Sequence, residues 1–363
     1  MRKDIIPVVA NGKTSGVRAD GAHTLVIKLE GAVSYFEPLL ASIQTAPAHP
    51  RLRDGVSNGP YYVVEASRTR IALVKNPYYR KNIVPEIFFE VNEPLGQSIS
   101  KYQIGEIDIT CPTYFPAEQL HVYAETKDLR SLASPIVYLL EGHPERFHNA
   151  LNDFKMLCHL LPIDEIAHNL RGIVDRCTSL VPEAMMKACG TELMVASPRH
   201  AAAESGAVRH LLVLYADYYP NGVIVQYLKH AWEGAGLTVD ITGLPFERFV
   251  EERDAGNYDI CLSLLSPVFG HPMAYYLYYL SYLDEDTATR LEAQLNGLFR
   301  PMEVPNMQLA DIEQTILESA PIFPMLSGRF AYLQNPNLVG YQIYFDGSVS
   351  YNNLRWATED MRD

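Results

Sequence analysis

The fold of this chain is decided by one stretch in which three apolar runs alternate with two amphipathic ones. The apolar runs are Leu211-Leu-Val-Leu-Tyr215, Leu237-Thr-Val-Asp-Ile241 and Tyr258-Asp-Ile-Cys-Leu-Ser-Leu-Leu265. Helical patterns begin at Pro220 and at Phe246. Strand, helix, strand, helix and strand at this spacing predict parallel pairing with right-handed crossovers. The chain therefore contains a parallel α/β unit over residues 211–265.

Parallel sheets bind ligands beyond the carboxyl ends of their strands. In this chain those ends are Tyr215 to Tyr219 and Ser266 to His271. Aromatic side chains gather there, and aromatic rings with a few polar groups are typical of binding pockets. Our candidate ligand-binding residues are therefore Tyr218, Tyr219, Phe269, His271 and Tyr275.

The tyrosine-rich run from Tyr275 to Tyr282 follows Pro272 directly and admits two interpretations. It can form a helix that packs through Leu277 and Leu280 and keeps its tyrosines at the rim. Alternatively, the tyrosines can form a stacking wall for a bound solute at the mouth of the sheet.

A second informative segment reads Ser57-Asn-Gly-Pro-Tyr-Tyr-Val-Val-Glu65 and continues to Lys75-Asn-Pro-Tyr-Tyr79. A turn of small residues leads into a strand, polar residues reverse the chain, and an apolar strand follows, which predicts a β-hairpin. We expect further strands at 24–30, 87–91, 107–109 and 136–140, helices at 35–43 and 95–104, a helical region at 146–176 and an exposed connector at 190–208. The strand at 136–140 is our expected hinge between two lobes.

The composition limits the possible functions. At 363 residues the chain exceeds one ordinary hydrophobic core, so two lobes are expected. A net charge of −13 disfavours direct contact with nucleic acid, and no apolar run reaches the ~20 residues of a membrane helix. Five cysteines are too few for a disulfide framework, and their odd number disfavours an oxidising compartment. The N-terminus lacks a signal peptide and a lipidation site, which indicates the cytoplasm for the chain as given.

No catalytic or metal-binding pattern is present in the sequence. The four histidines at 143, 148, 159 and 168 lack the i, i+4 spacing of metal ligands. Cys158 and His159 are neighbours, so on a helix they point in different directions. No phosphate-binding loop, dinucleotide fingerprint or nucleophile elbow occurs. We therefore expect neither an enzyme nor a cofactor.

The hairpin segment resembles the signature of the family 5 extracellular solute-binding proteins, the receptors of peptide and nickel ABC importers. Their pattern is Gly-Thr-Gly-Pro-Tyr, a strand, a second strand and Asn-Pro-x-Tyr, and here Ser57-Asn58 replaces Gly-Thr. The stretches Gly105-Glu-Ile-Asp108, Ala320-Pro-Ile-Phe-Pro324 and Leu338-Val-Gly340 are similar to later motifs of the family. The matches run from Thr24 to Trp356.

This resemblance implies an α/β fold with two lobes, like that of type II periplasmic binding proteins. It implies a remnant of an N-terminal subdomain (1–45), lobe I (46–142), lobe II (143–325, with its parallel sheet at 211–265) and a C-terminal return to lobe I (326–363). The family's opening stretch has no counterpart before Thr24, so the resemblance implies an N-terminally truncated fold with an exposed sheet edge. Val268 stands where peptide-binding members carry the aspartate that receives the peptide's amino terminus.

The resemblance implies a monomer that closes two lobes on a small organic ligand or peptide for an ABC permease. Such receptors lie outside the cytoplasm. The alternative is the ligand-sensing domain of a cytoplasmic transcriptional regulator, which would work with a separate DNA-binding domain. Regulators of that kind share a compact second lobe and a closing stretch like Tyr344-Phe345-Asp346. The identity of the ligand does not follow from these motifs.

Overall fold

The structure is a computed structural model that describes residues 16–29, 31–42, 45–46, 59–91, 96–147, 149–177, 179–188, 210–299, 306–344 and 346–357. Its largest element is a six-stranded mixed sheet with the order β7-β11-β6-β10-β8-β9. Strands β8 (His210–Ala216), β9 (Thr238–Leu244) and β10 (Ile260–Leu265) are parallel, as predicted. Helices α8 (Asn221–Gly234) and α9 (Phe246–Ala255) form the two crossovers.

Helices cover both faces of this sheet, which is why its strands are so apolar. Successive residues of a strand point to opposite faces. Tyr138 and Leu140 therefore face a cluster with α5 (Leu151–His159), α6 (Ile163–Asn169) and α8. Val137 and Leu139 face a second cluster with α7 (Glu183–Ala188), α10 (Met273–Leu280), α11 (Glu285–Leu298) and α12 (Asn306–Ser319). The short helix α4 (Pro144–Phe147) adds Phe147 to the first cluster.

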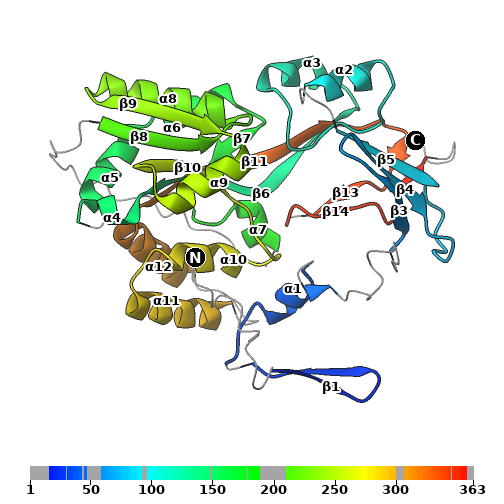
Figure 1. Cartoon of the computed structure of the whole chain (residues 1–363), viewed down its shortest axis with the longest axis horizontal. Helices are drawn as coiled ribbons and strands as arrows, with labels where there is room; N and C mark the ends of the chain where they lie inside the picture. The colour runs from blue at the N-terminus through cyan, green and yellow to red at the C-terminus, as the bar shows by residue number, and fades with distance from the viewer. Residues whose placement is uncertain are drawn as a thin grey trace.

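Two long antiparallel strands join the sheet to the rest of the molecule. Strand β11 (Ile322–Leu333) pairs with β6 (Leu129–Gly142) from Ile322↔Glu141 to Leu333↔Leu129, whereas β10 pairs only with residues 137–142 of β6. The remaining parts of β6 and β11 extend towards the three-stranded sheet (Figure 1). The short strand β7 (Val174–Arg176) adds to β11. The strand expected at 136–140 is therefore only the apolar half of a longer one.

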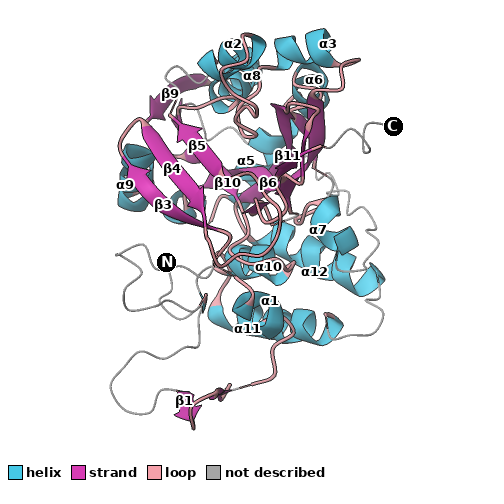
Figure 2. Ribbon diagram, turned by 90° about the vertical axis from the view of Figure 1, so that its right-hand side faces the viewer, coloured by secondary structure: helices cyan, strands magenta, loops and turns pink. Residues whose placement is uncertain are grey.

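The second half of the molecule is built around an antiparallel sheet in the order β3-β4-β5 (Figure 2). Strands β3 (Tyr61–Ala66) and β4 (Arg70–Lys75) confirm the predicted hairpin, and β5 (Glu86–Glu90) confirms the next strand. The turn residues Ser57 and Asn58 lie outside the described residues. Between 107 and 109 the expected strand is only a single bridge, Ile109↔Gln334.

The C-terminal segment returns to this half. Strands β12 (Leu338–Val339) and β15 (Arg355–Trp356) pair with each other, and β13 (Gln342–Ile343) and β14 (Val349–Ser350) form a hairpin. Leu338 and Leu354 pack with Tyr61, Ile83 and Val84 in a small core. Segments 61–84 and 338–354, which are far apart in the sequence, therefore share one core.

Two further groups of elements complete the described structure. The hairpin of β1 (Val17–Asp20) and β2 (Thr24–Ile27) precedes α1 (Phe36–Leu40), where a strand and a helix were expected. The elements α2 (Gln97–Gln103), η3 (Ala117–Gln119) and α3 (Leu120–Tyr123) lie against the first cluster of the large sheet. The expected helix at 95–104 is α2, although its first predicted residue falls outside the described ranges.

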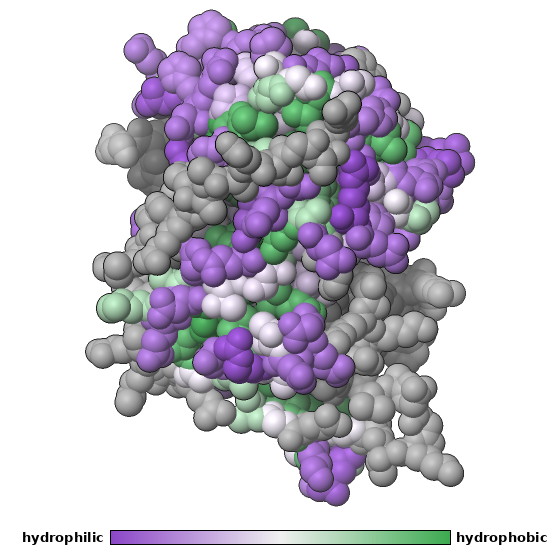
Figure 3. Space-filling view, turned by 90° about the vertical axis from the view of Figure 1, so that its left-hand side faces the viewer, coloured by the Kyte–Doolittle hydropathy of each residue, from purple (hydrophilic) through white to green (hydrophobic). Residues whose placement is uncertain are grey.

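On the face drawn in Figure 3, hydrophilic residues dominate the upper part, and hydrophobic residues show between them further down. None of the helices in the described part of the chain is long and apolar enough to cross a bilayer. The connector predicted at 190–208, along with His148, Cys189 and Phe345, lies outside that part. The lobe boundaries at 45, 142 and 325 stay a prediction.

Candidate functional site

The β6–β11 pair is the place where the two halves of the molecule meet, and Pro135 is contacted from both. From the large half, the hydroxyl of Tyr275 donates a hydrogen bond to the carbonyl oxygen of Pro135. From the small half, Gly347 at the tip of the β13–β14 hairpin lies close to the same Pro135. A Cβ at Gly347, whose φ is 80°, would lie 3.2 Å from Pro135 Cγ. A glycine is therefore favoured here by both its φ and the close approach.

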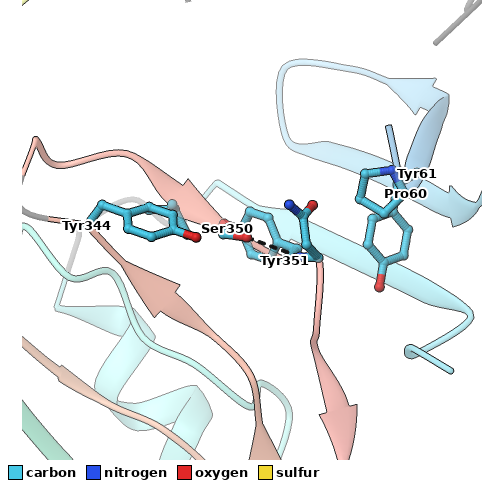
Figure 4. A pocket seen from close by; sticks show the side chains of 7 residues that line it. Pro60, Tyr61, Tyr344, Ser350 and Tyr351 are labelled. Atoms are coloured by element: carbon cyan, nitrogen blue, oxygen red, sulfur yellow. Dashed lines mark hydrogen bonds between the residues drawn. The ribbon is translucent and has the colours of Figure 1, made fainter. Parts of the chain in front are cut away.

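A hollow of ≈370 Å³ opens in the small half beside this contact. We call it the tyrosine hollow. Its walls come from the start of β3, from Tyr344 and from the strand β14 with the residues after it (Figure 4). The residues that line it are Pro60, Tyr61, Tyr344, Val349, Ser350, Tyr351 and Asn352. In Figure 4, Tyr344 lies on one side and Pro60 and Tyr61 on the other, with Ser350 and Tyr351 between them.

Two of the three tyrosines in the hollow are held by the protein itself. The hydroxyl of Tyr61 donates to the carbonyl of Val84 at 3.1 Å, and burial raises the pKa of Tyr61 to about 12. The ring of Tyr351 packs against Tyr341 and edge-on against Phe89, with ring centres 5.7 and 5.6 Å apart. These two rings therefore form fixed walls.

The third tyrosine is different. Tyr344 is 40% exposed, and its hydroxyl has no hydrogen-bond partner within the described residues. The same holds for the side-chain amide of Asn352, whereas Ser350 Oγ accepts a bond from the Asn352 backbone N–H at 3.3 Å. No charged side chain stands among the described lining residues. The tyrosine hollow thus offers fixed aromatic surfaces and unused neutral polar groups.

A second hollow, of only ≈20 Å³, lies on the strands β6 and β11, which we call the hinge strands because the predicted hinge at 136–140 is part of β6. We call it the hinge hollow. Its walls come from segment 112–115, from both hinge strands and from Pro220 after β8. Arg329 lies there, and its guanidinium bonds Asp175 Oδ2 at 2.9 Å and Ser131 Oγ at 3.2 Å. A space of this size admits at most one water molecule.

Of the five predicted site residues, Tyr219 directly precedes Pro220 in the wall of the hinge hollow, whereas Tyr218 packs with Phe249 and Cys261 in a separate small cluster. The hydroxyl of Tyr219 accepts a hydrogen bond from the Ala117 backbone N–H at 2.8 Å, and its ring meets Tyr114 at 5.5 Å. Burial raises the pKa of both Tyr218 and Tyr219. The carboxyl end of β8 therefore contacts the segment before β6 across the hinge.

The other three, Phe269, His271 and Tyr275, are buried in the second cluster of the large sheet. Phe269 stacks on Tyr35 from the N-terminal segment at 5.3 Å. The Nδ1 atom of His271 accepts from the Met273 backbone N–H at 3.2 Å, and burial lowers the pKa of His271 to about 4. This histidine is therefore neutral at physiological pH.

The structure thus separates Tyr219, which packs against the first cluster, from Phe269, His271 and Tyr275 on the other face of the sheet. The strands β8 and β10 are neighbours, but the chain leaves β8 into α8 on one face and leaves β10 into α10 on the other. Contact of these five residues with a ligand stays a prediction. Val268, between the two groups in sequence, is 61% exposed.

One of our interpretations placed the tyrosines of α10 at the rim of the helix, but three of its four tyrosines are buried. Tyr275, Tyr276 and Tyr279 are fully buried, whereas Leu277 is only partly buried. The hydroxyl of Tyr276 donates to Glu313 Oε1 at 2.7 Å, and that of Tyr279 donates to the Leu180 carbonyl at 2.8 Å. Tyrosine can be buried wherever its hydroxyl finds such a partner.

Sequence reasoning missed the tyrosine hollow. Strands β13 and β14 have two residues each, too few to produce a recognisable alternation. Tyr344 stood out only as part of the closing aromatic stretch. Within the described residues, no three or more His, Cys, Asp or Glu side chains gather in a way that could hold a metal ion.

Comparisons with known proteins agree with this architecture. Residues 2–148 match the family model of bacterial extracellular solute-binding proteins, family 5 Middle. No curated protein matches the chain in sequence.

Three solved structures illustrate the likeness in fold. A dipeptide-binding protein from Pseudoalteromonas sp. SM9913, in complex with Met-Leu, is 15% identical with a TM-score of 0.76, over 94% of this chain and 75% of that one. The murein tripeptide-binding protein MppA of Escherichia coli is 18% identical with a TM-score of 0.76, over 95% and 75%. An oligopeptide ABC transporter substrate-binding domain from Bacillus anthracis is 17% identical with a TM-score of 0.74, over 95% and 76%. This likeness confirms the expected two-lobed α/β fold.

Proposed function

Because residues 2–148 match the family model of bacterial extracellular solute-binding proteins, family 5 Middle, we propose that this chain binds a small organic ligand or a peptide and presents it to an ABC-type permease. The single observation that supports a binding site is the tyrosine hollow, whose described lining residues all belong to the small half. Its volume of ≈370 Å³ lies within the range of small-molecule sites, about 300–1,000 Å³.

The hinge is the proposed route from binding to transport. Pro135 is contacted by Tyr275 from one half and by the hairpin tip at Gly347 from the other. A ligand that binds the closed arrangement better than the open one shifts the population towards closure. Among the structures alike in fold are an oligopeptide ABC transporter domain and a dipeptide-binding protein, which supports a permease as partner and peptides as possible ligands.

We propose no catalytic step for this protein, because the family and its structural neighbours are binding proteins. A role as the sensing domain of a transcriptional regulator has no support in these comparisons, so it is not carried forward.

A thermal-unfolding screen tests the proposal. The purified chain is heated with dipeptides, tripeptides, neutral sugars, sugar phosphates and metal chelates. A ligand that binds only the folded form at a hundred times its Kd stabilises it by about 2.7 kcal/mol, which raises the midpoint by several degrees. Small-angle scattering with the same ligand would show a smaller radius of gyration if the lobes close. A screen in which no compound moves the midpoint would overturn the proposed function.

A further inference from the structure

The charge of the tyrosine hollow restricts the ligand that it can take. Its described lining residues are uncharged. A charged group inside the hollow would lose water without gaining an opposite charge, which is unfavourable.

The polar groups of the hollow point to a ligand with hydroxyl groups. The Tyr344 hydroxyl can donate and accept, the Asn352 amide offers two N–H donors and one acceptor, and Ser350 Oγ retains a donor proton. In Figure 4 the hydroxyl end of Tyr344 points towards Ser350 and Tyr351. A hydroxyl group is both donor and acceptor, so it can pair with any of these groups.

The apolar surfaces of the hollow suit a compact ring. Tyr61 and Tyr351 are fixed by contacts behind them, and Pro60 and Val349 complete the apolar lining. Rigid rings bind at a low cost in conformational entropy. The volume of ≈370 Å³ lies near the lower end of the usual range for ligand sites, about 300–1,000 Å³. The ligand is therefore small rather than an extended chain.

The hollow therefore suits a ligand that is uncharged, carries hydroxyl groups and is compact. An uncharged ring with hydroxyl groups around its edge and apolar C–H groups on its faces meets these three conditions. Resting on the proposed solute-binding function, we propose that the tyrosine hollow binds a neutral saccharide of one or two rings. A free peptide matches these conditions poorly, because at neutral pH its ends carry an ammonium and a carboxylate group.

Calorimetry with defined probes tests this assignment. Maltose, cellobiose and chitobiose are titrated into the full chain beside dialanine, trialanine and glucose 6-phosphate. We expect at least one neutral disaccharide to bind at least tenfold more tightly than the charged sugar and the peptides.

Variants locate the site. Tyr344→Ala is expected to weaken disaccharide binding at least tenfold, and Asn352→Ala by about five- to tenfold, because each removes hydrogen-bonding groups from the lining. Tyr78→Ala is the matched control, since Tyr78 is 89% exposed in the same half and does not line the hollow. It should leave the Kd unchanged. Unchanged melting midpoints of the free variants would show that each still folds.

Three results would overturn the assignment. If peptides bind and no disaccharide does, the saccharide inference fails while the solute-binding function stands. If disaccharides bind equally well to the Tyr344→Ala and Tyr78→Ala variants, they bind elsewhere, and the inference fails again. If no probe binds and no compound in the broader thermal-unfolding screen raises the melting midpoint, both the saccharide inference and the proposed function fail.

Discussion

Tyrosines gather in two regions of this molecule and serve different purposes in each. In α10, Tyr275, Tyr276 and Tyr279 are fully buried, and each hydroxyl has a protein acceptor. In the tyrosine hollow, Tyr344 is 40% exposed and its hydroxyl lacks a described partner. The same type of side chain is thus part of the core in one place and a partly exposed wall of a hollow in the other. The difference lies in what the rest of the fold supplies to the hydroxyl.

The largest expected effect is on the buried side of this comparison. Tyr276→Ala should lower the free energy of unfolding by about 3–5 kcal/mol, as for other large aromatic side chains in cores. It removes a ring that packs 5.9 Å from Phe299 and leaves Glu313 without one donor. Tyr344→Ala, in the hollow, should cost no more than about 0.5–1 kcal/mol. Urea unfolding of both variants measures the difference, and equal losses would break the comparison.

A smaller expected effect is the pH dependence of stability that comes from Glu313, the carboxyl group that accepts the hydrogen bond of Tyr276. Burial raises the pKa of Glu313, although hydrogen bonds from Tyr276 and Ser179 oppose that shift. A carboxyl whose folded pKa is raised contributes stability that is present below its unfolded pKa and lost as the pH rises through the folded value. The stability of the Glu313→Gln variant relative to the wild type should therefore increase as the pH rises from pH 4 to pH 8.

Melting midpoints of the wild type and the Gln variant across that range check the sign. In the Gln variant, the dependence of the melting midpoint on pH should become weaker but should not vanish, because burial also raises the pKa of Glu141. A wild type that grows more stable than the variant as the pH rises would contradict the assignment of a raised pKa to Glu313.

The smallest expected effect is at the carboxyl end of β8, where a tyrosine is less buried than those of α10 but already has a hydrogen-bond partner. Tyr219 is partly buried, and its hydroxyl accepts from the Ala117 backbone N–H at 2.8 Å. Tyr219→Phe removes that acceptor and should cost about 1 kcal/mol. Tyr78→Phe at an exposed position serves as the control. Hydrogen exchange of the Ala117 amide should quicken in the Phe variant, and an unchanged rate would indicate that the contact contributes nothing.

The elements that sequence reasoning predicted well are those with a strong local pattern. The apolar runs at 211–265 alternate with helical periodicity, and the structure confirms three parallel strands with two crossover helices. The hairpin at 61–75 was equally clear, because turn residues separate two runs of β-branched and aromatic residues. Strand β6 was found only over 136–140, because its first half includes Arg130, Ser131 and Pro135 and is held by pairing with β11.

The amino-acid sequence alone determined the parallel α/β unit, the antiparallel hairpin and the family resemblance, because each depends on residues that are close together in the chain. Only the tertiary structure decided that α10 buries its tyrosines, since Glu313, Leu180 and Pro135 accept their bonds from distant segments. It alone also decided where a hollow forms, because Pro60 and Tyr61 meet Tyr344 and residues 349–352 only in the folded chain. A local pattern reports which face of an element is apolar, whereas hydrogen-bond partners and cavities arise from segments that the sequence keeps far apart.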